Sequence, residues 1–400
     1  MHMKLFIKFC LLFVCGSALA HEEHTRYQAG SLAVSVAMDA QGAVWRVAEK
    51  DGMVMVDVSR DLAKTFSKPL AVNSAPQKIG ADGEARPKIA IGPQGQVYVT
   101  WTEALKQPYA GYIWFARSLN QGKSFEKPYI VHQDRTEITH RFDSINLAKN
   151  GTITVSWVDK RDLIAAKAAG KPYEGAAIYY ARSLDNGASF AAEKKLADSS
   201  CECCRIAMTN KPDGTAVAMW RHVCAGNERD PMMAESPSSA SQPAVIKRAT
   251  YGRWKIDGCP HHGAALASGG EGQDWWGYHM AWFDGDNDAN GQSAGLYYAR
   301  MDGVAWASTP AKKFAGSKNL AGHPALLSVG ENVFLVWRES EVKTHKILGK
   351  YSDDGGRNWS EPKLLAETTG KADYPQLLNR DKQVYLAWQT AQESLRLIAW

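Results

Sequence analysis

The sequence predicts an all-β fold, a β-propeller made of four-stranded antiparallel blades, from two repeated patterns. The first is a short alternating apolar segment that ends in Trp and leads into a polar turn. The second is a turn that begins with Ser and ends with Phe or Trp. Each unit holds several β-branched or aromatic runs separated by Gly, Asp and Asn, which is the chemistry of strands and tight turns. Repeats of this period are typical of propellers and solenoids.

The tryptophan repeat predicts the number of blades. Its segments end at Trp45, Trp101, Trp157, Trp220, Trp282, Trp337 and Trp388. The intervals are 56, 56, 63, 62, 55 and 51 residues, which leaves room for the four strands of a blade. Seven units predict seven blades, with six as the alternative. The last unit has room for only three strands, so we expect the segment after His21 to supply the fourth and close the ring.

The turn motif appears as SLDNGASF (183–190) and SDDGGRNW (352–359), with near matches at 118–125 and 59–66. In such a turn Asp or Asn accepts backbone N–H bonds, Gly takes a left-handed φ, and the aromatic side chain fills the space below. The motif resembles the Asp box of the sialidase superfamily. The resemblance covers nearly all of the chain after residue 20 and implies one propeller domain, 21–400. Sialidases have six blades, which keeps the six-bladed alternative open.

The first twenty residues have the pattern of a secretory signal peptide. Lys4 and Lys8 precede an apolar stretch, 9–14, and Ala18-Leu19-Ala20 offers a cleavage site. No apolar run approaches the roughly 20 residues that a membrane-spanning helix needs. We therefore expect a periplasmic or secreted protein, 21–400, without a membrane span. The formal net charge of +5 is too small to predict binding to nucleic acid.

Propeller geometry predicts one pocket at the top face. The inner strand of each blade begins beside the central channel and the second strand ends there. Residues before an inner strand, or after a blade tryptophan, should therefore surround the channel mouth. Every cysteine after residue 20 occupies such a position: Cys201, Cys203, Cys204, Cys224 and Cys259.

Two chemistries compete for these cysteines, and the sequence leaves both open. Disulfides are the default in an oxidising compartment, although five cysteines leave one unpaired. The other chemistry is a transition-metal site, with copper first and zinc second, because thiolate and imidazole groups bind both metals. The expected metal ligands are Cys203, Cys204, Cys259, His261, His262 and His323.

The sialidase resemblance also implies a site for an acidic sugar. Sialidases hold a carboxylate with three arginines, which is sensible because guanidinium groups bind carboxylates in a bidentate manner. They also use a Tyr–Glu nucleophile pair and an acid/base Asp. The candidate catalytic residues here are Arg86, Arg141, Arg205, Arg221, Asp159 and Asp284. Arg205 and Arg221 are equally placed to lie beside a metal site or to bind an anion.

The chain also departs from the sialidase pattern. No Tyr is clearly paired with a Glu, and cysteines and histidines stand where sialidases carry catalytic residues. Our main hypothesis is therefore an extracytoplasmic propeller with a copper or zinc site, acting in metal handling or in metal-dependent chemistry on a small ligand. One alternative is a sialidase-like glycoside hydrolase with disulfide-bonded cysteines. The other is a non-catalytic propeller that binds carbohydrate or protein at its top face.

Overall fold

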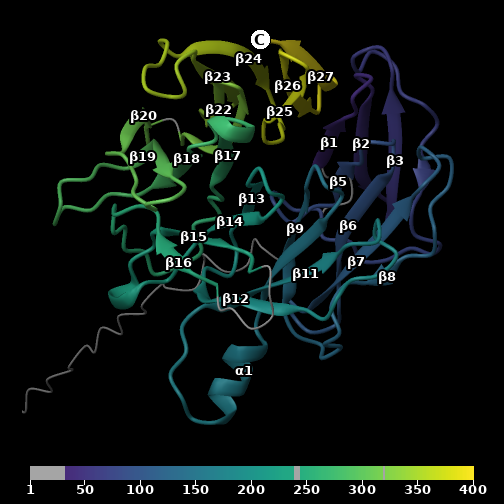
Figure 1. The fold of residues 1–400 in the computed structure, drawn as a ribbon, viewed down its shortest axis with the longest axis horizontal. Coiled ribbons are helices and arrows are strands. Elements are labelled where there is room, and N and C mark those ends of the chain that lie inside the picture. Colours follow the sequence, from purple (N-terminus) through teal and green to yellow (C-terminus); the bar gives the residue numbers. More distant parts are fainter. Residues whose placement is uncertain (1–31, 238–243, 319) are drawn as a thin grey trace, which may run out of the picture.

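The computed structural model describes residues 32–237, 244–318 and 320–400, in which seven antiparallel sheets form a ring (Figure 1). Six sheets have four strands and the last has three, and each strand pairs with its neighbours in the chain. The predicted seven-bladed propeller is confirmed and the six-bladed alternative is wrong. The signal peptide and the expected closing strand fall in residues 1–31, which lie outside the described residues.

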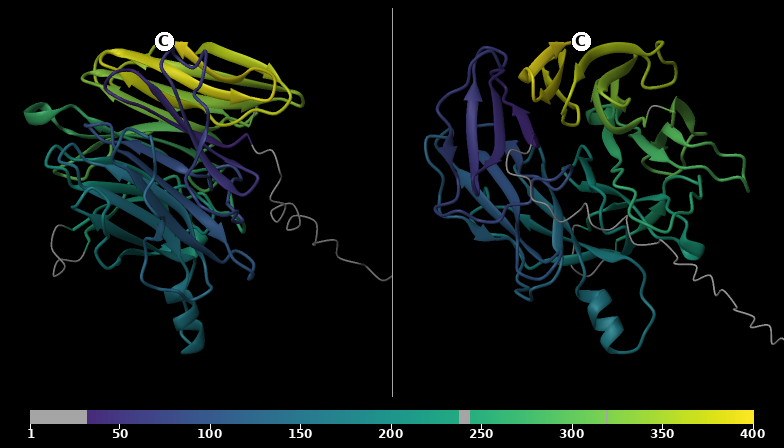
Figure 2. Two further views of the ribbon diagram at one scale, coloured as in Figure 1. Left: turned by 90° about the vertical axis from the view of Figure 1, so that its right-hand side faces the viewer. Right: turned by 180° about the vertical axis from the view of Figure 1, so that it is seen from behind.

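The first three blades hold strands β1 to β12 and the one α-helix of the described residues. Blade 1 consists of β1 (Val34–Met38), β2 (Val44–Lys50), β3 (Met53–Ser59) and β4 (Leu70–Ala71). Blade 2 consists of β5 (Lys88–Ile91), β6 (Val97–Ala104), β7 (Gly111–Ser118) and β8 (Tyr129–Ile130). Blade 3 consists of β9 (His140–Leu147), β10 (Ile153–Asp159), α1 (Arg161–Ala168), β11 (Ala176–Ser183) and β12 (Lys194–Ser200). Helix α1 has no buried residue and projects away from the ring (Figures 1 and 2).

The remaining blades hold strands β13 to β27. Blade 4 consists of β13 (Ala207–Asn210), β14 (Ala216–Arg221), the 3₁₀ turn η2 (Ala225–Asn227), β15 (Pro231–Glu235) and β16 (Ile246–Arg248). Blade 5 consists of β17 (Ala265–Gly269), η3 (Gly272–Asp274), β18 (Gly277–Asp284), β19 (Gly295–Asp302) and β20 (Lys312–Gly316). Blade 6 consists of β21 (Gly322–Val329), β22 (Asn332–Ser340), β23 (Thr344–Ser352) and β24 (Lys363–Thr369). Blade 7 consists of β25 (Gln376–Arg380), β26 (Gln383–Thr390) and β27 (Ser394–Ala399).

The seven repeat tryptophans all lie on the second strand of their blade and are buried between neighbouring sheets. In three blades the indole N–H donates to a carboxylate two residues further on. These hydrogen bonds are 3.0 Å from Trp157 to Asp159, 2.8 Å from Trp282 to Asp284 and 3.0 Å from Trp337 to Glu339. Side chains two residues apart on a strand lie on the same face, so the acid is positioned to accept this bond.

The four Ser-initiated turns share one hydrogen-bond pattern. In the turn after β11, Ser183 Oγ donates to Asp185 Oδ1 at 2.7 Å and accepts from the N–H of Gly187 at 2.8 Å. The equivalent atoms are joined in the turns that begin at Ser59, Ser118 and Ser352. This hydrogen bonding stabilises each turn where two outer strands meet.

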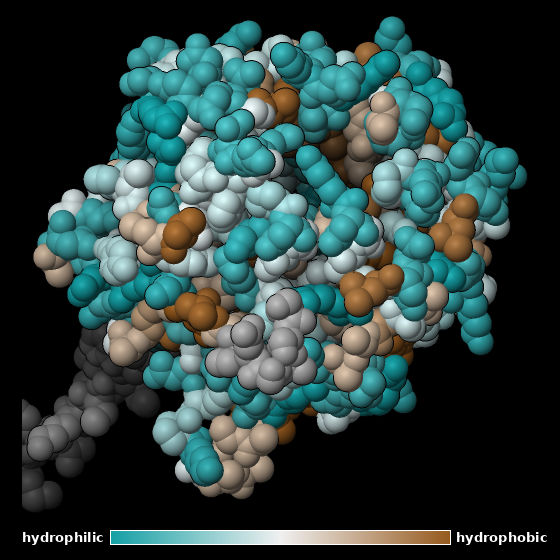
Figure 3. Space-filling view, viewed as in Figure 1, coloured by the Kyte–Doolittle hydropathy of each residue, from teal (hydrophilic) through white to brown (hydrophobic). Residues whose placement is uncertain are grey.

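The aromatic residue that ends each turn connects neighbouring blades. Phe190 of blade 3 packs edge-on against Phe115 of blade 2, with ring centroids 5.0 Å apart. Trp359 of blade 6 packs in the same way against Tyr298 of blade 5, at 4.7 Å. The turn motif therefore contributes to packing between blades as well as to the turn. Apolar residues on the face in Figure 3 are scattered among hydrophilic ones.

A buried ion pair closes the ring between its last and first blades. Arg86, before β5, donates to both carboxylate oxygens of Asp373, before β25, at 2.5 and 2.6 Å. The backbone of Val34 in β1 joins the same pair, because its N–H donates to Asp373 at 3.1 Å and its carbonyl accepts from Arg86 at 2.9 Å. Gln376 of β25 adds hydrogen bonds to β1. Within the described residues, each of these hydrogen bonds involves at least one side chain, and together they hold the last blade against the first.

We predict that Asp373→Asn destabilises the protein by about 3–5 kcal/mol, because Arg86 then stays buried without a counter-charge. Urea unfolding followed by tryptophan fluorescence measures the change. Glu393→Gln is the matched control, since Glu393 forms a solvent-exposed pair with Arg396, and exposed pairs contribute about 0–1 kcal/mol. Equal unfolding midpoints for the two variants would show that the buried pair does not hold the ring closed.

His279 of β18 is a neutral histidine in the core. Its Nδ1 lies 2.7 Å from the Tyr298 hydroxyl, and its ring packs edge-on against Trp276. Burial, assisted by the nearby charge of Arg300, lowers the pKa of His279 from its ordinary value of 6.5 to about 3. In the unfolded chain the His279 imidazole is therefore protonated below about pH 6.5, whereas in the folded chain it stays neutral down to about pH 3.

We predict that His279→Gln makes stability less sensitive to acid. The neutral histidine contributes fully above pH 6.5, and between pH 6.5 and 3 its contribution to the free energy of unfolding falls by about 1.4 kcal/mol per pH unit. The variant should be less stable than the natural protein at pH 7 but lose less stability between pH 6.5 and 4. Denaturant unfolding at several pH values tests this, and parallel pH profiles would contradict it.

Candidate metal centre

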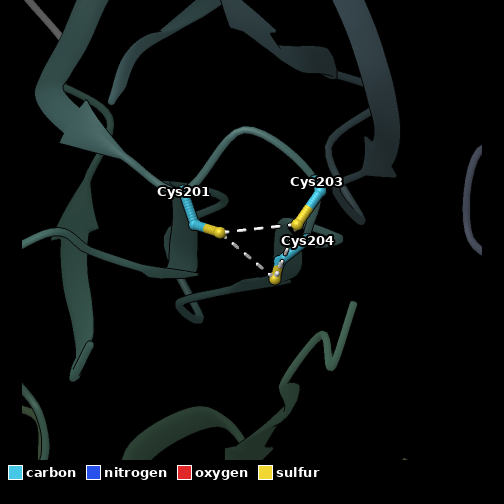
Figure 4. Close-up of side chains that lie close together, drawn as sticks. All are labelled: Cys201, Cys203 and Cys204. Atoms are coloured by element: carbon cyan, nitrogen blue, oxygen red, sulfur yellow. Dashed lines mark hydrogen bonds between the residues drawn. The ribbon is translucent and has the colours of Figure 1, made fainter. Parts of the chain in front are cut away.

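Three cysteine side chains meet on the short loop between β12 and β13. The Sγ atoms of Cys201 and Cys203 are 3.6 Å apart, those of Cys203 and Cys204 are 3.9 Å apart, and those of Cys204 and Cys201 are 3.6 Å apart. Figure 4 shows the three sulfur atoms turned toward one another across the loop. All three residues are buried and belong to the apolar core between blades 3 and 4.

The sulfur spacing matches the geometry of metal ligands. A disulfide requires two sulfur atoms about 2.05 Å apart. Thiolates around a tetrahedral ion with metal–sulfur bonds of about 2.3 Å lie about 3.8 Å from one another. The observed spacing is close to the second value, and all five cysteines in the described residues are free thiols. The loop therefore presents three sulfur donors at the separation that one metal ion requires.

A second donor group extends the cluster into blade 5. The ligand atoms of Cys203, Cys259 and His261 lie within 4.8 Å of one another. Cys259 and His261 come from the loop before β17, whereas Cys203 comes from the loop before β13. Cys259 is exposed and His261 is half-buried, so this side of the cluster is open to solvent. The two loops together supply four thiols and one imidazole.

Neighbouring groups make one cysteine the most acidic. Hydrogen bonds from Cys203, Cys204 and Cys259 lower the pKa of Cys201 well below its ordinary value. Hydrogen bonding to Cys201 raises the pKa of Cys204, and the positive charge of Arg221 acts in the opposite direction. The cluster thus has a preferred site for its first thiolate and a fixed cation beside it.

Arg221 is held rigidly by protein groups. Its guanidinium donates to Asp284 at 3.1 Å and to the carbonyl of Arg229 at 2.6 Å, and it is buried. Burial raises the pKa of Asp284 to about 6, against the opposing effect of Arg221. The charge of Arg221 acts on Cys204 and Cys201, and its role beside a metal or an anion stays a prediction. Asp284, proposed as a catalytic acid, is bound to Trp282 and Arg221.

The Glu84 carboxylate holds the two ligand loops together. This buried residue precedes β5 in blade 2, yet its Oε2 accepts the N–H of Arg205 at 3.1 Å and the N–H of Gly263 at 3.2 Å. Arg205 follows Cys204 directly, and Gly263 comes two residues after His261. Burial alone would raise the pKa of Glu84, but Arg205, His323 and the N–H donors hold it well below its ordinary range. One carboxylate oxygen therefore sets the distance between the two loops.

His262 and His323, both expected as ligands, lie outside the two donor groups. The His262 ring stacks on Phe283 at 4.3 Å, and its Nδ1 is buried without a hydrogen-bond partner in the described residues. The His323 ring stacks on Tyr374 at 3.6 Å, and its Nδ1 lies 3.5 Å from Glu84. The centroids of the two imidazole rings are 5.2 Å apart.

The other candidate catalytic residues are spread around the channel. Arg86 closes the ring through Asp373, and Asp159 is buried between Trp157 and Arg161. Arg205 donates to the carbonyl of Ala264 at 2.8 Å and pairs with Glu84 at 3.6 Å. Arg141 lines a separate pocket, whose wall includes Lys78, Asp82, Lys106 and Tyr109. The six candidate catalytic residues therefore do not lie together in one site.

Sequence reasoning missed Cys201 and Glu84 as functional residues. The signal for Cys201 was present, because the CECC segment places three thiols within four residues. No local signal marks Glu84, since its partners lie in blades 4, 5 and 6.

Comparison with solved structures supports the fold. An ulvan lyase of polysaccharide lyase family 25, bound to -[GlcA(1-4)Rha3S]-, superposes with a TM-score of 0.52 at 13% identity, covering 91% of this chain and 93% of that one. A protein of unknown function from Dyadobacter fermentans gives 0.50 at 13%, covering 82% and 96%. The Hadza microbial sialidase Hz136 gives 0.49 at 15%, covering 87% and 73%. The ulvan lyase and the Dyadobacter protein therefore share the overall fold of this chain.

Similarity at these identities establishes the fold and leaves the activity to be argued from the site. No family model and no curated protein sequence matches the chain. In the part of the chain that the structure describes, no helix is long and apolar enough to cross a membrane.

Proposed function

We propose that this protein binds a thiophilic transition metal at the loops that lead into blades 4 and 5 and acts in metal handling outside the cytoplasm. The observation that carries the proposal is the triangle of buried sulfur atoms, 3.6–3.9 Å apart, formed by Cys201, Cys203 and Cys204. Cys259 and His261 stand beside it. The secretory pattern at 1–20 supports a periplasmic or secreted location.

The donor set favours Cu(I) first and Zn(II) second. Thiolates are soft ligands, and sites rich in them select Cu(I) and Zn(II) over harder ions such as Mg²⁺ or Mn²⁺. Among the described residues, neither donor group includes a carboxylate. Three buried sulfur atoms suit the low coordination number of Cu(I), whereas a structural Zn(II) site takes four ligands.

Metal handling fits the site better than catalysis by a metal-bound water. The inner sulfur atoms are buried, and the candidate acid Asp284 is already hydrogen-bonded to Trp282 and Arg221. A hydrolytic metal site keeps one open position beside a free acid or base. The exposed Cys259 instead lets another molecule deliver a metal ion to the cluster.

We predict that the natural protein, purified from the periplasm without chelators, carries Cu or Zn and that Cys203→Ser/Cys204→Ser loses it. Elemental analysis gives the metal content, and a thiol titration of the denatured, metal-free protein should find the five cysteines of residues 32–400 unpaired. Cys224→Ser is the control, because Cys224 belongs to neither donor group. A protein that binds neither Cu(I) nor Zn(II), and that shows at most one free thiol, would establish the disulfide alternative.

A second candidate function is the binding or cleavage of an acidic glycan at the Arg141 pocket. Its lining includes the cations Arg141, Lys78 and Lys106, with Tyr109 as an aromatic surface and Asp82 as an acid. Three cations and one carboxylate favour an anionic ligand.

For this second candidate we predict that Arg141→Ala abolishes turnover of a fluorogenic sialoside or uronate substrate, because it removes a cation of the pocket. Lys318→Ala, an exposed change outside the pocket lining, should leave turnover unchanged. Absence of turnover in the natural protein would exclude a hydrolase or lyase acting on those substrates.

A further inference from the structure

We propose that the cluster binds two metal ions and that the Cys203 thiolate bridges them. The inference rests on the proposed metal-binding function and specifies how many ions the site takes. The inner ion would be held by Cys201, Cys203 and Cys204. The outer ion would be held by Cys203, Cys259 and His261.

The donor atoms fall into two groups, with Cys203 in both, and Cys259 of the outer group also hydrogen-bonds to Cys201 of the inner group. Each group of three has all its ligand atoms within 4.8 Å of one another, and the Cys203 sulfur belongs to both groups. Metal–ligand bonds of about 2.0–2.3 Å require all ligands of one ion to surround one point. Five donors around one ion would form one mutually close set. Here Cys204 belongs only to the first group and His261 only to the second, so the five donors do not surround one point, and the shared Cys203 sulfur is placed to bridge two ions.

Charge gives an independent reason for a second ion. Four thiolates carry four negative charges, so one Cu(I) would leave a net charge of about −3 and one Zn(II) about −2. The positive charge of Arg221 acts on Cys204, but Arg221 already pairs with Asp284. Uncompensated charge is costly in the low-dielectric core, and these three inner cysteines are at most 5% exposed. A second ion lowers the net charge to about −2 with Cu(I) or to zero with Zn(II).

The two positions differ in their access to solvent. The inner position is enclosed by buried sulfur atoms, whereas the outer position has the exposed Cys259 and the half-buried His261. The outer ion would exchange first, and the shared Cys203 sulfur would let an ion move inward while it stays bound to thiolate. The outer position is thus a transfer position and the inner one a retention position.

Metal titration of the reduced, metal-free protein tests the inference. The protein is titrated anaerobically with Cu(I) against a chromogenic chelator and, in a separate arm, with Zn(II). The natural protein and Cys224→Ser should bind two ions per chain. Cys259→Ser/His261→Ala, which changes only the open side of the cluster, should bind one. Cys203→Ser should bind fewer than two, and thermal unfolding verifies that each variant is folded.

Chelator challenge and X-ray absorption supply a second readout. The loaded natural protein should release its ions in a fast and a slow phase, and Cys259→Ser/His261→Ala should show only the slow phase. Two bridged ions should also give a metal–metal distance below about 4 Å. One ion per chain in the natural protein would overturn the two-ion inference and keep the proposed function. No bound ion in either arm would overturn both.

Discussion

The Glu84 carboxylate is the interaction on which the centre of this propeller depends. Glu84 precedes β5 of blade 2, and its carboxylate accepts backbone N–H bonds from the loops that lead into blades 4 and 5, while His323 of blade 6 lies 3.5 Å away. Those two loops carry all the donors of the proposed metal site. A charged group at this depth is stable only because several partners face it, and Arg205 is one of them. The same bonds that stabilise Glu84 therefore position the cysteines.

The blades could be predicted because their signals are local. A tryptophan on the second strand, and a turn such as that from Ser183 to Phe190, are both specified within a few residues. Seven copies of the tryptophan pattern were sufficient to count the sheets. The closeness of Cys203 and Cys259, which stand on loops that lead into adjacent blades, followed from this geometry.

The remaining features depend on contacts between distant segments. Arg86 was assigned to an arginine triad because its position suited a ligand, but its partner Asp373 lies at the far end of the chain. Asp159 and Asp284 had a nearer signal, since each stands two residues after a tryptophan whose indole it binds. His262 lies on the same loop as Cys259, and His323 lies at the start of β21, yet their rings stack on Phe283 and Tyr374. Sequence position selected the right loops but not the direction of each side chain.

The pair between Arg86 and Asp373 also sets an order of folding. Its two residues are 287 positions apart, and closing a chain segment of that length costs about 5 kcal/mol of conformational entropy. The metal donors all lie within residues 201–261, so their segment closes at a smaller entropic cost. During folding, the middle blades can assemble their thiols before the last blade docks. Metal capture can therefore precede ring closure, and a bound ion would then act as a folding nucleus for blades 4 and 5.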